Sequence, residues 1–165
     1  MERILIIGSP GAGKTTLARS LSEKLGLPLV HLDVLHWRDG WVEAPREEFD
    51  ALLNEALAEP RWIIDGNYSR TLPLRLSRCD TAVYLDYPRL LCLWGAVKRV
   101  LANPGKSRPD MGGDCPERFD LEFLRYIWDF RKTQRQKLFA LLDGFDGQVI
   151  VLRNRWEARE FVDRM

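Results

Sequence analysis

The residues best suited to chemistry lie near the start of the chain, where Gly8-Ser9-Pro10-Gly11-Ala12-Gly13-Lys14-Thr15 follows four apolar β-formers. This spacing of glycines before Lys-Thr is that of a Walker A phosphate loop. The glycines let the backbone turn tightly and point successive N–H groups inward, which makes an anion site at the start of a helix. Lys14 adds a positive charge, and the Thr15 hydroxyl is a ligand for Mg²⁺. We predict a polyphosphate site formed by Gly8, Pro10, Gly11, Ala12, Gly13, Lys14, Thr15 and Thr16.

Three acidic residues stand at strand ends that would face this loop. Asp33, Asp65 and Asp86 each follow a short apolar run that predicts a strand. The carboxyl ends of parallel strands form the ligand-binding edge of open α/β sheets. An apolar strand that ends in Asp is the Walker B pattern, in which the carboxylate holds Mg²⁺ through water. We predict that Asp65 has this role, because a polar turn rich in possible ligands follows it; Asp86 is the alternative.

A further group of residues could hold a second substrate. Asp33 is a candidate for orienting a hydroxyl group or accepting its proton, and its structural alternative is a turn or helix-capping residue. We expect the acceptor pocket to be lined by Trp37, Asn67, Tyr68 and Arg70. An ordinary core position is an equally good interpretation of Trp37.

The elements that must position these residues follow from apolar spacing. Apolar runs predict strands at 4–7, 29–32, 62–64, 81–85 and 148–152. Helical spacing predicts helices at 15–25, 49–57 and 90–101, and the last of these carries Leu90, Leu93, Trp94, Val97 and Leu101 on its apolar face. A loop with Trp37 and Trp41 is expected before the second helix. Strands and helices alternate, as in one α/β core.

An insertion is expected before the last strand, because about sixty residues separate it from the fourth strand and a single helical crossover needs a dozen or so. Residues 103–116 contain three prolines and three glycines, a composition typical of a mobile flap. A long helical pattern follows over 116–142.

Arginines crowd this insertion, namely Arg99, Arg108, Arg118, Arg125, Arg131 and Arg135. Arg118 and Arg125 are seven residues apart, which is two turns on one helix face. Guanidinium groups that a closing flap brings over a polyphosphate would neutralise charge on the transferring group. We therefore predict catalytic roles for Arg108, Arg118 and Arg125. The alternative is a solvated helix face with ion-pair partners.

The length and net charge of the chain limit the number of domains and the kinds of partner that it can have. At 165 residues, 45% of them hydrophobic, the chain is expected to form a single domain over 1–165. The 25 Lys and Arg against 24 Asp and Glu give a formal charge of +1, so no global field favours nucleic acid or a membrane as a partner. Three widely spaced cysteines and the lack of an apolar leader predict free thiols and a cytoplasmic protein.

With the phosphate loop, Asp33, Asp65-Gly66 and the arginine-flanked flap in this order, the chain resembles the adenylate-kinase-like P-loop kinases. Within them, Trp62 to Tyr68, Ser107 to Met111 and Cys115 to Asp120 look like the group labelled DNA topology modulation proteins (FlaR-related). The resemblance implies a three-layer α/β/α P-loop NTPase fold, with a five-stranded parallel sheet of order 2-3-1-4-5. It also implies an acceptor-binding subregion at about 34–61 and a helical lid insertion at about 103–118.

The activity that the resemblance implies is transfer of the γ-phosphoryl group from ATP, with Mg²⁺, to a small acceptor. Arg99 in the insertion and Arg153 after the last strand are then expected to contact the nucleotide. Arg70 stands one position later than the arginine with which adenylate kinases grip the acceptor phosphate, which disfavours AMP. The family default is a monomer or weak dimer. Two alternatives stay open: a nucleotide-dependent regulator or ATPase associated with DNA topology, and a nucleotide-binding module without transfer activity.

Overall fold

Five apolar runs form one parallel sheet in the computed structural model, which describes residues 1–165. The strands are β1 (Arg3–Gly8), β2 (Leu29–His31), β5 (Trp62–Asp65), β6 (Thr81–Leu85) and β7 (Gln148–Leu152). They lie in the order β2-β5-β1-β6-β7, and every neighbouring pair is parallel. Counted along the chain, this is the predicted order 2-3-1-4-5, which is confirmed.

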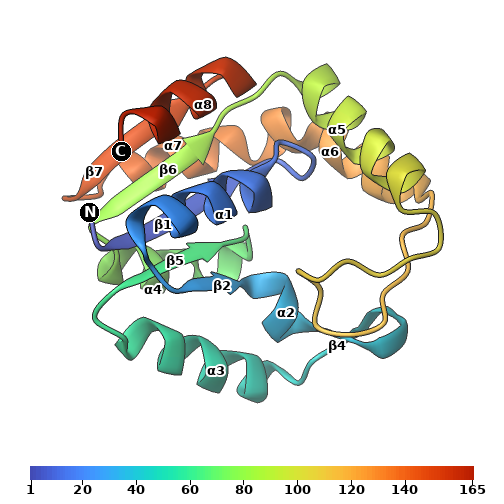
Figure 1. Cartoon of the computed structure of the whole chain (residues 1–165), viewed down its shortest axis with the longest axis horizontal. Coiled ribbons are helices and arrows are strands. Elements are labelled where there is room, and N and C mark those ends of the chain that lie inside the picture. The colour runs from blue at the N-terminus through green and yellow to red at the C-terminus, as the bar shows by residue number, and fades with distance from the viewer.

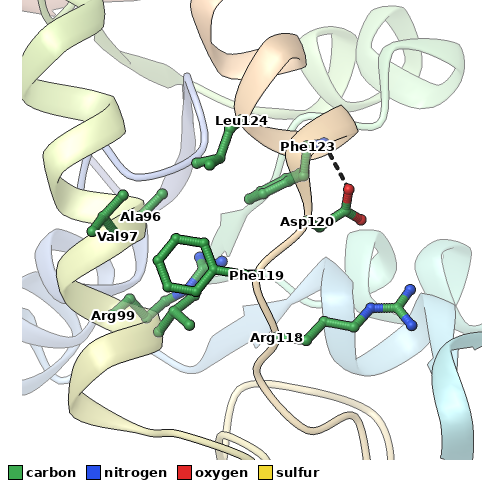
Figure 2. Close-up of a pocket in the computed structure, with 9 residues that line it drawn as sticks. Ala96, Val97, Arg99, Arg118, Phe119, Asp120, Phe123 and Leu124 are labelled. Carbon is green, nitrogen blue, oxygen red and sulfur yellow. Dashed lines mark hydrogen bonds between the residues drawn. The ribbon is translucent and has the colours of Figure 1, made fainter.

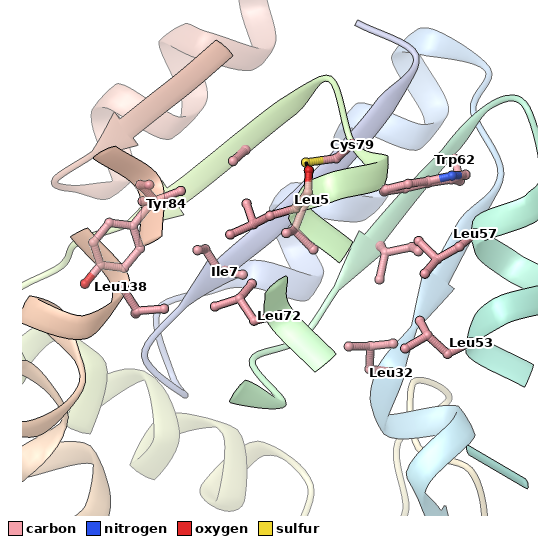
Figure 3. Packing of buried hydrophobic residues seen from close by; sticks show 14 of the residues in the cluster. Leu5, Ile7, Leu32, Leu53, Leu57, Trp62, Leu72, Cys79, Tyr84 and Leu138 are labelled. Atoms are coloured by element: carbon pink, nitrogen blue, oxygen red, sulfur yellow. Dashed lines mark hydrogen bonds between the residues drawn. The ribbon is translucent and has the colours of Figure 1, made fainter. Parts of the chain in front are cut away.

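Helices cover both faces of the sheet, as buried parallel strands require (Figure 1). Successive side chains of a strand point to opposite faces, so Leu5 and Ile7 enter one apolar cluster while Ile4 and Ile6 enter the other. Figure 3 shows the first cluster, in which α3, α4 and α7 pack on the sheet. The second cluster joins the sheet to α1, α5 and α8. The bounds of these helices are α1 (Lys14–Leu25), α3 (Arg46–Ala58), α4 (Leu72–Arg78), α5 (Arg89–Ala102), α7 (Arg135–Asp143) and α8 (Arg155–Asp163).

The segment between β2 and α3 is more ordered than the expected loop. It contains the short helix α2 (Leu32–His36) and a hairpin of β3 (Trp37–Arg38) and β4 (Val42–Glu43), joined by the 3₁₀ turn η1 (Asp39–Trp41). Another 3₁₀ turn, η2 (Ser69–Thr71), precedes α4. Residues 32–58, from α2 through α3, are called the arm below.

Helix α5 forms as expected, but three of the five residues predicted for its apolar face are exposed, while Leu93 and Val97 are half-buried. Leu90, Trp94 and Leu101 are 68%, 57% and 63% exposed, whereas Cys92 and Ala96 are buried. The small side chains face inward because this helix approaches the backbone of the phosphate loop, as described below.

The helical pattern predicted over 116–142 forms two helices rather than one long helix. Residues 116–120 are not helical, and two helices follow, α6 (Leu121–Thr133) and α7, with Gln134 between them. The Asp120 carboxylate accepts a hydrogen bond from the Phe123 N–H and so caps the start of α6. Because Arg118 precedes this cap, it shares no helix face with Arg125.

The glycine- and proline-rich loop at 103–120, called the lid below, is packed rather than free, contrary to the expectation of a flap. Asp110, Met111 and Cys115 are buried. The lid leaves α5, descends to the arm and returns to α6 on the right of Figure 1. Its Asp114 carbonyl accepts from Gly40 N–H at 2.9 Å.

Close backbone packing completes this contact between lid and arm. A Cβ atom on Gly112 would lie 2.1 Å from the Trp37 carbonyl oxygen and 2.3 Å from that of Val34. Only glycine fits there, because any side chain would collide with the backbone of the arm.

None of the eight α-helices has the length and apolar composition needed to cross a lipid bilayer.

Candidate functional site

The phosphate loop joins β1 to α1 and has the backbone form of an anion cradle. Gly8, Gly11 and Gly13 have φ values of 150°, 77° and 94°, which L side chains rarely adopt. The Lys14 Nζ donates to the carbonyl oxygens of Gly8 at 2.9 Å and Ser9 at 3.2 Å. Burial lowers the pKa of Lys14, and the charge of Asp65 acts in the opposite direction. The ammonium group is therefore partly desolvated beside the cradle, where an anionic ligand would attract it.

Helix α5 touches the phosphate loop backbone to backbone. A Cβ atom on Gly11 would lie 2.0 Å from the Cys92 carbonyl oxygen, and one on Gly95 would lie 2.1 Å from the Gly11 carbonyl oxygen. Neither glycine can be enlarged without moving the helix or the loop. Helix α5, which leads into the lid, therefore packs directly against the backbone of the phosphate loop.

Asp65 lies beside the Thr15 hydroxyl, as the Walker B pattern predicts. Thr15 Oγ1 donates to Asp65 Oδ2 at 3.1 Å, and the ring Nδ1 of His31 lies 2.7 Å from Asp65 Oδ1. A hydroxyl and a carboxylate oxygen are the donors that Mg²⁺ prefers, so this pair fits the ion. Asp86, the alternative, forms ion pairs with Arg131 at 3.5 Å and Arg135 at 2.9 Å.

The lid reaches the same hydroxyl from the other side. Asp110 Oδ2 lies 3.5 Å from Thr15 Oγ1, and Arg108 Nη1 donates to Asp110 Oδ2 at 2.6 Å. The Asp110 carboxylate thus lies between Arg108 and Thr15. Asp110 was not a predicted site residue, although it follows Arg108-Pro109 in one of the motifs noted above.

The turn after β5 joins the phosphate loop to the arm. The Asn67 side-chain oxygen accepts from Gly8 N–H at 3.1 Å, and the Tyr68 hydroxyl donates to Asp33 Oδ1 at 2.6 Å. Burial raises the pKa of Tyr68, and the nearby Asp33 carboxylate raises it further. Tyr68 therefore stays a hydrogen-bond donor. Asp33 lies in the first turn of α2, directly after the predicted strand 29–32.

A buried arginine that the sequence analysis missed holds this turn in place. Arg75 is fully buried and donates to the carbonyl oxygens of Gly66 at 2.9 Å, Tyr68 at 2.9 Å, and Asn67. Burial lowers its pKa to about 9, which leaves the guanidinium charged at neutral pH. Tyr68 has a φ of 28°, a strained value for a residue other than glycine. Arg75 thus holds the backbone that presents Asn67 and Tyr68.

Aromatic rings gather beside Asp33. The His36 ring centroid lies 4.7 Å from those of both Trp37 and Tyr68, and Phe49 lies 5.3 Å from Tyr68. Arg70, predicted to line the pocket, instead extends over the surface to Asp50, with a hydrogen bond of 3.0 Å. This part of the site is thus more aromatic than cationic.

The remaining predicted arginines lie in different places. Figure 2 shows that Arg118, on the segment before α6, extends away from α5 and from Arg99. The Arg118 guanidinium is 5.9 Å from the Trp41 ring centroid on the arm. Arg125 is exposed and pairs with Asp129 at 3.9 Å, and the exposed Arg153 follows β7. The structure therefore brings Arg108, but neither Arg118 nor Arg125, to the phosphate loop.

Comparisons with known proteins find a family model and several kinases that match parts of this chain. The model of the ATPase family associated with various cellular activities (AAA) matches residues 4–65, from β1 to Asp65. Over 62 residues the chain is 45% identical to the shikimate kinase of Thermobifida fusca, covering 33% of this chain and 36% of that one. Over 142 residues it is 27% identical to the cytidylate kinase of Pyrobaculum aerophilum, covering 77% and 74%.

A solved structure shows the same fold over nearly the whole chain. The shikimate kinase of Acinetobacter baumannii in complex with shikimate has a TM-score of 0.60 at 20% identity, covering 99% of this chain and 90% of that one. In sequence, by contrast, the chain aligns with only 36% to 51% of the length of one shikimate kinase and three proteins described as adenylate kinases. The chain thus has the fold of P-loop kinases and local sequence similarity to them.

Proposed function

We propose that this protein is an ATP-dependent kinase that transfers the γ-phosphoryl group of MgATP to a hydroxyl group of a small acceptor. The observation that carries the proposal is the convergence on Thr15, where Asp65 and the lid's Asp110–Arg108 pair meet beside the glycine cradle. An anion cradle, a hard-oxygen pair for a cation and a lid cation are the parts that phosphoryl transfer requires. The matches to nucleotide and shikimate kinases support it.

The proposed roles follow from these positions. The N–H groups of Gly11, Gly13, Lys14, Thr15 and Thr16, together with the Lys14 ammonium group, hold the phosphates, while Thr15 and Asp65 hold Mg²⁺. The bound ion would supply neutralising charge to the phosphate oxygens. Arg99 and Arg153 are proposed to contact the nucleotide, and Arg108 to act on the transferring group. Arg118 and Arg125 would act there only after the lid and α6 move.

The acceptor is proposed to lie between the arm and the lid, against Asp33, Trp37, Asn67 and Tyr68, with Arg70 at the rim. Its hydroxyl oxygen forms a bond to the γ-phosphorus as the bond to the β–γ bridging oxygen breaks. The electron pair stays on ADP, and the hydroxyl proton passes to Asp33, whose second oxygen takes no hydrogen bond from Tyr68. The protein mainly orients the two reactants and stabilises charge. The motifs at 62–68 and 107–120 also support placing the chain in the FlaR-related group.

A binding measurement and a transfer assay test the proposal. Isothermal calorimetry should detect MgATP binding to the wild-type chain, and a screen of nucleosides, sugars and hydroxy acids with labelled ATP should identify an acceptor. Lys14→Met should lower transfer by at least about a hundredfold, the scale of losing one preorganised charge-stabilising donor. Lys137→Met, on an exposed lysine of α7, is the matched control. Absence of MgATP binding, or normal turnover by Lys14→Met, would refute the proposal.

A further inference from the structure

The base of the lid is closed by its own backbone. The Gly105 N–H donates to the Glu117 carbonyl oxygen at 3.2 Å, and the Glu117 N–H donates to the Lys106 carbonyl oxygen at 3.1 Å. The two ends of the lid are therefore paired at Glu117. The Glu117 side chain is 3% exposed, so its carboxylate is buried inside this neck.

The buried carboxylate lies between two arginines from different elements. Glu117 Oε1 is 2.9 Å from Arg99 Nε on α5 and 2.6 Å from Arg108 Nε in the lid. Burial and the charge of Arg108 both lower the pKa of Arg99, whereas the charge of Glu117 raises it. Two guanidinium groups so close together in a poorly hydrated place repel each other unless an anion lies between them.

The contacts of Glu117 with the two arginines are electrostatic rather than hydrogen bonds. Arg99 Nε, Arg108 Nε and Glu117 Oε1 are buried yet make no hydrogen bond of good geometry, so these contacts are electrostatic. Arg108 continues toward the phosphate loop through Asp110, which lies beside Thr15. The Asp110 carboxylate beside Thr15 therefore holds Arg108 next to the phosphate loop.

We propose that Glu117 is a positioning residue for phosphoryl transfer, whose carboxylate holds Arg99 and Arg108 together so that the closed lid presents Arg108 to the transferring phosphate. This inference rests on the proposed function. Glu117 touches neither nucleotide nor acceptor and acts through Arg108. If Arg108 contacts the transferring group only as charge spreads over it, loss of Glu117 slows the reaction and leaves nucleotide binding nearly unchanged.

The test uses the full chain and needs no known acceptor, because water can take the acceptor's place. In single-turnover hydrolysis, a water oxygen bonds to the γ-phosphorus while the bond to the β–γ bridging oxygen breaks. The products are ADP, inorganic phosphate and a proton released to solvent. The hydrolysis rate and the calorimetric affinity for MgATP are measured for Glu117→Gln, Glu117→Asp, Arg108→Met and the double variant Glu117→Gln/Arg108→Met.

Glu117→Gln should lower the hydrolysis rate by at least about tenfold, within the range attributed to a single charge-stabilising group. Its affinity for MgATP should change by less than about threefold, because ground-state contacts remain. Glu117→Asp keeps the charge and should recover part of the rate. Adding Glu117→Gln to Arg108→Met should change the rate little further, since residues that act through one another are not additive. Glu122→Gln, on the exposed side of α6, is the control for loss of a carboxylate.

Wild-type rates in Glu117→Gln would overturn the inference while leaving the proposed function intact. The inference would also be overturned if Glu117→Gln lowered both the MgATP affinity and the melting temperature, and if these losses added to those of Arg108→Met. Glu117 would then have a structural role only. Absence of MgATP binding by the wild-type chain would instead refute the proposed function.

Discussion

Arg75 provides the most direct test of how the turn after β5 is held. Its guanidinium group is fully buried and donates to three successive carbonyl oxygens, those of Gly66, Asn67 and Tyr68. Methionine has a similar length and flexibility but no donor. Arg75→Met therefore keeps most of the packing and removes only the hydrogen bonds and the charge.

The magnitude follows from which carbonyl groups lose their partners. The Tyr68 oxygen keeps a bond from the Thr71 N–H at 3.0 Å, whereas no other donor reaches the Gly66 and Asn67 oxygens. A buried acceptor left without a partner costs about 1–3 kcal/mol, so two cost about 2–6 kcal/mol. Relief from burying a charge offsets part of this loss. We expect unfolding to become easier by about 3 kcal/mol, or a melting temperature lower by about 6–12 °C for a chain of this size.

Urea unfolding followed by circular dichroism measures this loss. The control is Arg78→Met, the same change one turn later on the exposed side of α4. It should lie within about 0.5 kcal/mol of wild type, as surface substitutions usually do. If Arg75→Met unfolds as Arg78→Met does, the three bonds are not what holds the turn, and the reasoning is wrong.

Two further predictions concern the lid and the phosphate loop. Gly112→Ala should open the lid, because its Cβ would meet the Trp37 and Val34 carbonyl oxygens. Such overpacking destabilises the closed lid by about 1–3 kcal/mol. Tryptic cleavage after Lys106 should therefore accelerate roughly fivefold or more. Gly144→Ala, where a Cβ meets nothing closer than 3.9 Å, is the control, and equal cleavage of both would contradict the packing. MgATP affinity should fall as pH rises through the pKa of Lys14, which burial holds below 10.5, because only the protonated amine attracts phosphate. Calorimetry at neutral and alkaline pH measures this, and constant affinity would count against a role for the Lys14 charge.

The sheet and the phosphate loop could be predicted because their signals are local. The glycine spacing around Lys14 and the strand that ends at Asp65 are contained in short stretches, and the sheet order came with the family resemblance. Two of the missed residues, Asp110 and His31, contact partners far along the chain: Asp110 is 95 residues from Thr15, and His31 is 34 residues from Asp65. No local pattern says which carboxylate an arginine will meet, which is why Arg118 and Arg125 were expected at the phosphates.

Composition misled in two places for physical reasons. In α5, leucines predicted the buried face, but a helix that touches backbone must turn its smallest residues inward. Cys92, Gly95 and Ala96, three and four residues apart, carried that signal. In the lid, glycines predicted motion, yet Gly112 is needed because the arm leaves no room for a side chain.

The contact between Gly11 and Gly95 sets a rule for anyone who recombines this chain with a relative. A chimaera that exchanges only the lid loop keeps the native helix against the cradle and should fold. One whose crossover point falls between Pro88 and Ala96 imports a foreign helix surface against Gly11. The phosphate loop and α5 must then come from the same parent protein. The segment that can be exchanged as a unit is therefore larger than the lid loop alone.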